Sequence, residues 1–292
     1  MRRLEDCNPI VITVYFLAMT LVLMFSQNPI LLLIGGIGAL AYFLMRDKGN
    51  TLSSHIFYLA LFAALTVINP LTSHNGKTVM FVINDSPVTL EATVYGAVNA
   101  GIIVTVLYLF RSFSSIMTRD KLLYVFGKLS PRLSLVLSMA LRYVPLFGER
   151  ARRISESQRA IGLYRDENVI DKIKSDLRVF SILITWALEN GITTADSMSA
   201  RAYGKHKRTY YSIFGFHLCD GLMLGIIISC TALTVLGMAL GALDFTFYPS
   251  IRSADPTPLS ITAYAAYGIL AILPTITETE ERLKWKYLQS RI

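Results

Sequence analysis

The sequence predicts an all-α integral membrane protein, with about six transmembrane helices and a long helical cytoplasmic region between the fourth and the fifth. Composition is the first observation, since 53% of the 292 residues are hydrophobic and only 16% are charged. A soluble domain usually carries about a quarter charged residues. The other two observations are six long apolar stretches and the position of the basic residues between them. Together they divide the chain into N-terminal transmembrane helices (1–110), cytoplasmic helices (111–216), and C-terminal transmembrane helices with a cytoplasmic tail (217–292).

Each of the six apolar stretches has about the length that a membrane span requires. A spanning helix needs about 20 mainly apolar residues, with roughly 17 at the lower end of the range. No Asp, Glu, Lys or Arg lies near the middle of any stretch, and Glu91 sits at an end. Because ionisable residues inside a membrane usually mark ion pathways or proton relays, the pattern argues against a self-sufficient secondary transporter. The stretches are 10–26, 29–45, 55–71, 90–110, 219–243 and 258–274.

The basic residues predict the orientation of the chain. If the N-terminus is cytoplasmic and the spans alternate, 26 of the 28 Lys and Arg residues lie on the cytoplasmic side. Only Lys77 and Arg252 then lie outside, as the positive-inside rule requires. We therefore expect a multi-pass protein of the cell membrane whose two termini and middle region are cytoplasmic.

Glycines in two of the stretches favour close packing between helices. Gly35, Gly36 and Gly38 lie in the second stretch, and Gly237 and Gly241 form a small-xxx-small pair in the fifth. Small residues let helix backbones approach closely in a membrane, so packing is preferred to a binding role.

The cytoplasmic segment predicts two long helices. Ser130 can cap the first, with Pro131 in its first turn, and the helical pattern then runs to Gly162. The second starts near 166–171 and runs to Gly204. Its apolar run of about ten residues is too short to span a membrane. That run can line the membrane interface or pack on another protein helix.

The two predicted helices end in similar four-residue sequences, "RAIG" at 159–162 and "RAYG" at 201–204. In each, an arginine lies in the last turn and a glycine can take the left-handed conformation that stops the helix. One explanation is local, because the helix dipole favours an exposed C-terminal arginine by at most about 1 kcal/mol. Matched docking points for a partner protein are the other explanation, since arginine beside small residues suits a protein groove.

A basic and aromatic segment follows the second helix. Lys205, His206, Lys207 and Arg208 precede two tyrosines, Tyr210 and Tyr211, just before the fifth apolar stretch. Such a cluster is typical of the cytoplasmic headgroup boundary, and we expect it to anchor the chain there.

Three longer segments resemble the T component of energy-coupling factor (ECF) transporters, vitamin and micronutrient importers related to ABC transporters. "NPLTSHNG" (69–76) resembles the family's Asn-Pro-Leu segment, and "TRDKLLYVFGKLSPRLSLVLSMALRYVPLF" (118–147) is similar to its first cytoplasmic region. "TWALENGITTADSMSARAYG" (185–204) resembles the stretch that leads into its second coupling motif. The resemblance covers nearly the whole chain.

The resemblance implies a coupling subunit with no catalytic, ATP or substrate site of its own. In that family the cytoplasmic coupling helices cross, and each ends in an Ala-Arg-Gly motif that docks into a groove on one of two ABC-type ATPase subunits. A separate S component binds the substrate. The implied partners are two ATPases, an S component and the lipid bilayer, without nucleic acid. This chain would bind no cofactor or metal, while the ATPases use ATP and Mg. The implied ATPase-binding residues are Arg159, Ala160, Ile161, Gly162, Ala200, Arg201, Ala202 and Gly204.

Both motifs depart from the family pattern in this sequence. In the second, Ala200 and Arg201 match, but Ala202 stands where glycine is expected. In the first, Ile161 replaces the arginine and Arg159 is the nearest substitute. We therefore expect Arg201 to be the firmer anchor and the two motifs to dock with different strength.

An apolar face of the second cytoplasmic helix has two interpretations. Phe180, Ile184 and Leu188 could form the surface on which the S component moves. They could equally form the core between the two long helices, which is the more frequent fate of such a stripe.

A membrane-embedded lipid-modifying transferase and a stand-alone permease are the alternatives. "DSMSAR" (196–201) resembles the opening of the CDP-alcohol phosphatidyltransferase motif. Metal-assisted phosphoryl transfer needs several carboxylates that converge on the ion. No acidic residue follows Asp196 until Asp220, Ser197 replaces the motif's glycine, and the chain has no Walker-type phosphate loop. The sequence therefore favours a non-catalytic subunit.

Overall fold

The computed structural model describes residues 4–46, 51–72, 76–83, 86–164, 168–204, 214–253 and 257–289. The chain forms two compact units. The first combines Met1–Leu122 with Phe214–Ile292, and the second is Leu123–Ile213. The first unit is therefore built from the two ends of the chain, with the second inserted between them.

Six helices make up most of the first unit. Five of them are at least 18 residues long and apolar enough to cross a membrane, and α1, with 17 residues, is shorter. The predicted all-α membrane class is confirmed, and α1 is at the lower end of the length that a span needs. Two helices continue past their predicted ends at 110 and 274. The six are α1 (Pro9–Phe25), α2 (Pro29–Arg46), α3 (Thr51–Thr72), α4 (Leu90–Ile116), α8 (Leu218–Ala239) and α9 (Pro258–Gln289).

Local capping sets where several of these helices begin. The side chain of Asn8 accepts a hydrogen bond from the N–H of Ile10, and Pro9 occupies the first turn of α1. Asn28 does the same for the N–H of Ile30 in α2, and the Thr89 hydroxyl accepts from the N–H of Ala92 in α4. These side chains satisfy backbone donors that have no partner within the helix.

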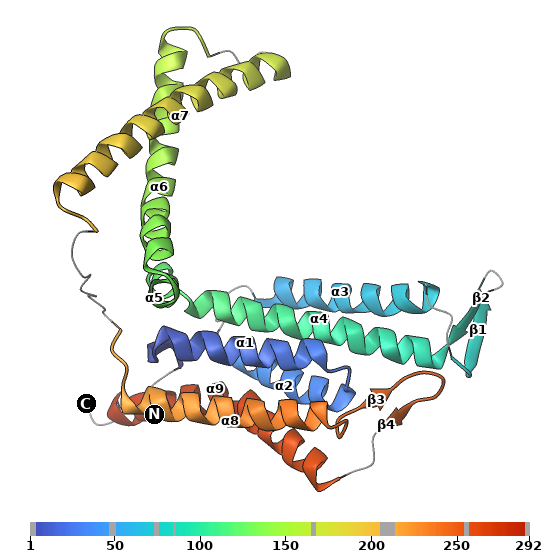
Figure 1. Ribbon diagram of the computed structural model, residues 1–292. Helices are drawn as coiled ribbons and strands as arrows, with labels where there is room; N and C mark the ends of the chain where they lie inside the picture. Colours follow the sequence, from blue (N-terminus) through green and yellow to red (C-terminus); the bar gives the residue numbers. More distant parts are fainter. Residues whose placement is uncertain are drawn as a thin grey trace. The chain divides into compact units, whose positions relative to one another are not determined.

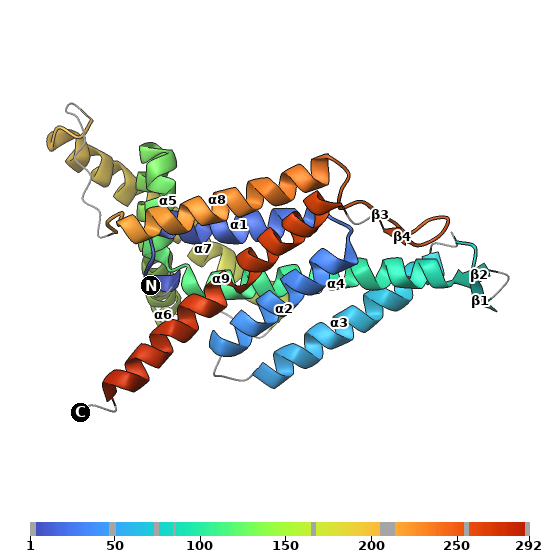
Figure 2. The ribbon, with the colours of Figure 1, turned by 90° about the horizontal axis from the view of Figure 1, so that it is seen from below.

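The helices of the first unit form a ring with one helix outside it. Around the ring, α1 packs on α8, α8 on α9, α9 on α2, α2 on α4, and α4 on α1. α3 packs on α4, and Figure 2 shows it at the edge of the unit. Tyr15, Met19, Leu31, Ile227 and Leu270 are buried between the ring helices.

The glycines of α2 and α8 confirm the predicted close packing. A Cβ at Gly38 would lie 2.7 Å from the Ala271 carbonyl oxygen of α9. A Cβ at Gly237 would lie 2.9 Å from the Cβ of Ala263, also on α9. Gly241 has a different role, because its φ of +72° places it in the left-handed turn that ends α8. α9 therefore packs against both neighbours through positions that any larger residue would obstruct.

Two short hairpins, which the sequence analysis did not predict, connect helices of the first unit. β1 (Val79–Ile83) pairs antiparallel with β2 (Ser86–Thr89) between α3 and α4. β3 (Phe245–Thr246) pairs antiparallel with β4 (Arg252–Ser253) between α8 and α9. The ring of Tyr95 on α4 lies 5.3 Å from that of Phe247, which fixes the second hairpin against α4.

The second unit consists mainly of α6 (Pro131–Ala160) and α7 (Val169–Ala200), which follow α5 (Arg119–Leu129). Both long helices were predicted, and Pro131 is in the first turn of α6 as expected. Ser130 occupies the N-cap position but makes no side-chain capping hydrogen bond, so proline rather than serine defines this start.

Aromatic contacts hold α6 and α7 together where they cross, near the middle of each helix (Figure 1). The Trp186 ring of α7 lies 6.0 Å from the Phe147 ring, and the Arg150 guanidinium lies 4.9 Å from the Trp186 ring centre. The hydroxyls of Tyr143 and Thr194 are 3.2 Å apart. The crossing leaves the C-terminal ends of both helices away from this contact.

Candidate functional site

The end of α6 is a Schellman turn. Gly162 has a φ of +76°, in the left-handed region that glycine adopts without a steric cost. Its N–H donates to the Arg159 carbonyl at 3.0 Å, and the N–H of Leu163 donates to the Gln158 carbonyl at 2.9 Å. These two bonds satisfy carbonyl groups that the helix leaves without partners.

The end of α7 has the same hydrogen-bond pattern, but an alanine stands in the glycine position. Ala202 has a φ of +57°. Its N–H donates to the Ser199 carbonyl at 3.0 Å, and the N–H of Tyr203 donates to the Met198 carbonyl at 3.1 Å. Gly204 takes the expected left-handed conformation, with a φ of +89°, but α7 already ends at Ala200, so the helix stops earlier than expected. The two Schellman bonds offset the cost of placing a Cβ in this conformation.

The hydrogen bonds therefore define a different alignment of the two ends from the one that the letters "RAIG" and "RAYG" suggest. Gly162 corresponds to Ala202, so Ile161 corresponds to Arg201. Arg159 corresponds to a serine of α7. Arg159 and Arg201 therefore have the same place in the two four-letter sequences but different places in the two turns. Ala160 and Ala200 are the last helical residues of α6 and α7, as the Ala-Arg-Gly pattern requires.

The side chains at the two ends differ in chemistry. Ile161 is 69% exposed, and Leu163 beside it is also exposed, so the end of α6 is apolar. Arg201 and Tyr203 are exposed at the end of α7, which is cationic and aromatic. Arg159 instead lies over the ring of Tyr164, with its guanidinium carbon 4.6 Å from the ring centre.

Contacts with α7 hold the turn that follows α6. The Tyr164 hydroxyl donates to an Asp176 carboxylate oxygen at 2.8 Å. Arg178 donates to the Leu163 carbonyl at 3.3 Å. The end of α6 is thus fixed against the first turns of α7.

The apolar face of α7 is exposed rather than part of a core between the long helices. Phe180 is 57% exposed and Leu188 64% exposed, and Ile184 between them is also exposed. On another face of α7, Val179 is buried and the Trp186 ring contacts α6. The first interpretation of this stripe, as a surface for a partner, is therefore the one that its exposure permits.

Comparison with known families shows what kind of protein carries this geometry. The profile of the cobalt transport protein family, CbiQ, matches residues 2–211, more than two thirds of the chain. The chain belongs to the CbiQ family. The match includes all of α6 and α7 and both Schellman turns.

Curated relatives of this CbiQ family member carry the name energy-coupling factor transporter transmembrane protein EcfT. The protein from Streptococcus equi subsp. equi is 32% identical over 106 residues, which are 34% of this chain and 39% of the relative. The one from Lacticaseibacillus paracasei is 31% identical over 106 residues, 36% and 40% of the two chains. The one from Streptococcus thermophilus is 31% identical over 122 residues, 41% and 44%. The matches span less than half of each relative, and they confirm the resemblance to T components.

Asp196 of the transferase-like motif and Asp220, the next acidic residue, have separate surroundings in this CbiQ family member. Asp196 is exposed on α7. Asp220 is buried at the start of α8, where its oxygens accept from the N–H of His217 at 3.0 Å and of Asn8 at 3.2 Å. Across the parts of the chain that the structure describes, no three His, Cys, Asp or Glu residues gather as a metal site would require. Residues 205–213, with the predicted basic and aromatic anchor, lie outside those parts, as do 73–75 of the "NPLTSHNG" segment.

Proposed function

We propose that this chain is the coupling subunit of an ECF-type vitamin or micronutrient importer, and that it transmits ATP-driven motion of two ABC-type ATPase subunits to a substrate-binding S component. The observation that carries the proposal is the pair of exposed helix ends with the same Schellman turn, on two helices that cross. Two equivalent ends on one rigid crossing suit two related ATPases.

Each helix end would dock into one ATPase through different chemistry. Arg201 follows the last helical residue of α7, so its guanidinium extends beyond the helix and can donate to carboxylates or carbonyls in a groove. Ile161 has the equivalent place on α6 and would bury its apolar side chain instead. The proposed docking residues remain 159–162, 200–202 and Gly204, with Arg201 as the main anchor and Arg159 as a support for the first turn.

Movement of the ATPases would reach the membrane through the crossing of α6 and α7. ATP binding draws the two ATPases together, and the docked helix ends follow. The packing of Trp186 against Phe147 and Arg150 makes the crossing a tight contact rather than a loose hinge. The exposed stripe that includes Phe180, Ile184 and Leu188 is the surface proposed for the S component. ATP and Mg would be used by the ATPases, and the chain itself would be neither an enzyme nor a cofactor protein.

The proposed orientation follows the positive-inside rule, with both termini and the second unit in the cytoplasm and the six helices of the first unit in the lipid bilayer of the cell membrane. This orientation places both helix ends on the side where ATP is available.

Co-purification tests the proposal. The full chain is co-expressed with the ATPase pair of its own organism, and the ATPases retained by the tagged chain are quantified. We expect the native chain to retain both ATPases and Arg201→Glu to lose most of them. Lys174→Glu is the matched control, because it makes the same charge change at an exposed site in an early turn of the same helix. A native chain that inserts in the membrane and retains no ATPase contradicts the proposal.

A further inference from the structure

A polar cleft lies in the first unit where α2, α4 and α9 end close to the short 3-10 helix η1 (Leu4–Asp6). It is open to the outside and has a volume of about 720 Å³. That volume is within the range of about 300–1,000 Å³ that is usual for small-molecule sites. Its lining includes three cationic side chains, Arg46, Arg282 and Lys286, together with Ser115 and Trp285.

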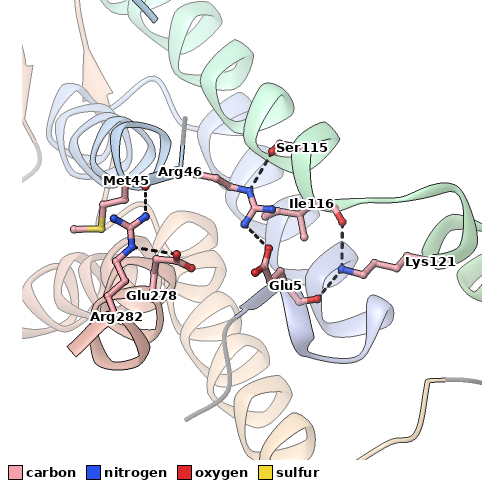
Figure 3. Close-up of polar contacts among 8 residues, drawn as sticks. All are labelled: Glu5, Met45, Arg46, Ser115, Ile116, Lys121, Glu278 and Arg282. Carbon is pink, nitrogen blue, oxygen red and sulfur yellow. Dashed lines mark hydrogen bonds and ion pairs between the residues drawn. The ribbon is translucent and has the colours of Figure 1, made fainter. Parts of the chain in front are cut away.

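Contacts with neighbouring helix ends hold the two arginines of the cleft in place. Arg46 donates to Ser115 at 3.1 Å and forms an ion pair with Glu5 at 2.7 Å. Arg282 donates to the Met45 carbonyl and pairs with Glu278 at 3.3 Å (Figure 3). A guanidinium has five N–H donors, so these contacts use only part of the capacity of each. The arginines are therefore positioned in advance for a further acceptor.

Lys121 supports this arrangement from outside the cleft. Its ammonium donates to the carbonyl oxygens of Glu5 at 2.6 Å and Ile116 at 3.2 Å (Figure 3). Burial lowers the pKa of Lys121, while the carboxylates of Glu5 and Asp6 oppose that shift. The contacts fix η1, and with it Glu5, next to the end of α4.

In the ion pair on α9 the cation is nearer the solvent, whereas Arg46 and Glu5 are similarly exposed at 21% and 27%. The Glu278 side chain is 8% exposed, whereas that of its partner Arg282 is 39% exposed. Lys286 is exposed one turn further along α9. Three cations and two carboxylates line the cleft, so its opening favours an anion. Arginine forks bind phosphate oxygens in a bidentate manner, which makes a phosphate group the best match.

The surroundings indicate that the phosphate belongs to a lipid. The cleft lies at the ends of apolar helices long enough to span a membrane. Leu283 and Trp285 are exposed on its rim, and tryptophan is typical of the level of the lipid headgroups. Basic pockets between transmembrane helices bind anionic headgroups elsewhere. We propose that this cleft binds the phosphodiester of an anionic phospholipid, held by Arg46, Arg282 and Lys286, with Trp285 against the glycerol and the first methylenes.

Native mass spectrometry of the full chain in detergent tests the proposal, with phosphatidylglycerol as the probe and phosphatidylcholine as the neutral comparison. We expect the chain to retain phosphatidylglycerol preferentially and Lys286→Gln to weaken its affinity about fivefold, the usual contribution of one cation at an anionic lipid surface. Arg282→Gln should weaken it at least as much. Lys286→Gln alone keeps the test valid if the loss of the Met45 contact destabilises the Arg282 variant.

Lys284→Gln is the matched control. It removes the same charge from the same helix, but Lys284 lies about 200° around α9 from Lys286 and does not line the cleft. We expect it to bind phosphatidylglycerol like the native chain. Equal losses in Lys284→Gln and Lys286→Gln would show that lipid binding follows only the overall charge of the tail. No preference for phosphatidylglycerol, or its displacement by inorganic phosphate at equal concentration, would also overturn the proposal, the latter in favour of a free-anion site.

Discussion

The ends of α6 and α7 share a backbone conformation and a final helical alanine, and they differ in the side chains that follow it. Both have the two Schellman hydrogen bonds and a residue with positive φ after the last helical alanine. α6 places glycine at the strained position and isoleucine before it, whereas α7 places alanine there and arginine before it. Backbone geometry at the two ends is thus the common feature, and side-chain chemistry is the variable one.

This difference has an energetic side as well as a chemical one. An L-residue in the left-handed region costs roughly 1 kcal/mol relative to glycine, so the end of α7 is less stable locally than that of α6. The end of α6 is also supported by Arg159, which lies over Tyr164, and by the bonds from Tyr164 and Arg178. The end that carries the exposed arginine is therefore the one that deforms more easily.

The largest expected effect is the contrast between two charge reversals. Arg201→Glu should weaken ATPase binding about tenfold or more, since a hydrogen bond to a charged group contributes about 1.5–3 kcal/mol. Arg159→Glu should weaken it much less, because Arg159 serves the local turn through Tyr164. Affinities for the purified ATPase pair measure both. Equal losses would show that the two ends dock alike and would contradict the proposed asymmetry.

An intermediate effect is expected from Gly162→Ala, which makes the end of α6 resemble that of α7. Gly162 has a φ of +76°, and an alanine in that conformation destabilises the turn by about 1 kcal/mol. The amides of Leu163 and Tyr164 should therefore exchange hydrogen about fivefold faster. Hydrogen exchange followed by mass spectrometry measures this. Gly148→Ala is the control in the same helix, because Gly148 has ordinary helical geometry and an added Cβ there meets nothing within 4 Å. That substitution should slow exchange instead.

The smallest expected effect is the reverse change, Ala202→Gly. It removes the strain at a φ of +57°, and glycine's larger entropy in the unfolded chain offsets part of the gain, which leaves roughly 0.5 kcal/mol of stabilisation. The Tyr203 amide should exchange more slowly than in the native chain. Ala195→Gly, at an exposed interior position of α7, should act in the opposite direction. Faster exchange in Ala202→Gly would mean that its Cβ stabilises the turn through contacts.

The sequence predicted those parts of the fold that depend on short segments. A membrane span is recognised from about 20 consecutive residues, so all six helices of the first unit were expected near their observed places. Pro131 marked the start of α6 because proline fits the first turn of a helix and fits poorly elsewhere in one. The second hairpin was missed because β3 and β4 have two residues each, too few for any alternation to show.

The sequence predicted which residues form the two helix ends, but it aligned the two ends with each other incorrectly. Glycine at 162 and 204 suggested two equivalent stops, but which residue of a turn takes positive φ depends on the carbonyl groups that its neighbours reach. Ala202 has no local signal for that conformation, and only the family pattern pointed to this position. The cleft of Arg46 and Arg282 could not be predicted at all, since its side chains come from distant segments and meet only when α2, α4 and α9 are assembled.

The hydrogen bond between Asp220 and the N–H of Asn8 has a consequence for the synthesis of the chain. These residues are 212 positions apart, so at about 5–20 residues per second the start of α1 waits roughly 10–40 s for this partner. During that interval the whole second unit is made, and α1 has no α8 to pack against. The ring of helices therefore closes only after the ribosome has completed the inserted unit, and a chain that stops before α8 leaves the ring open.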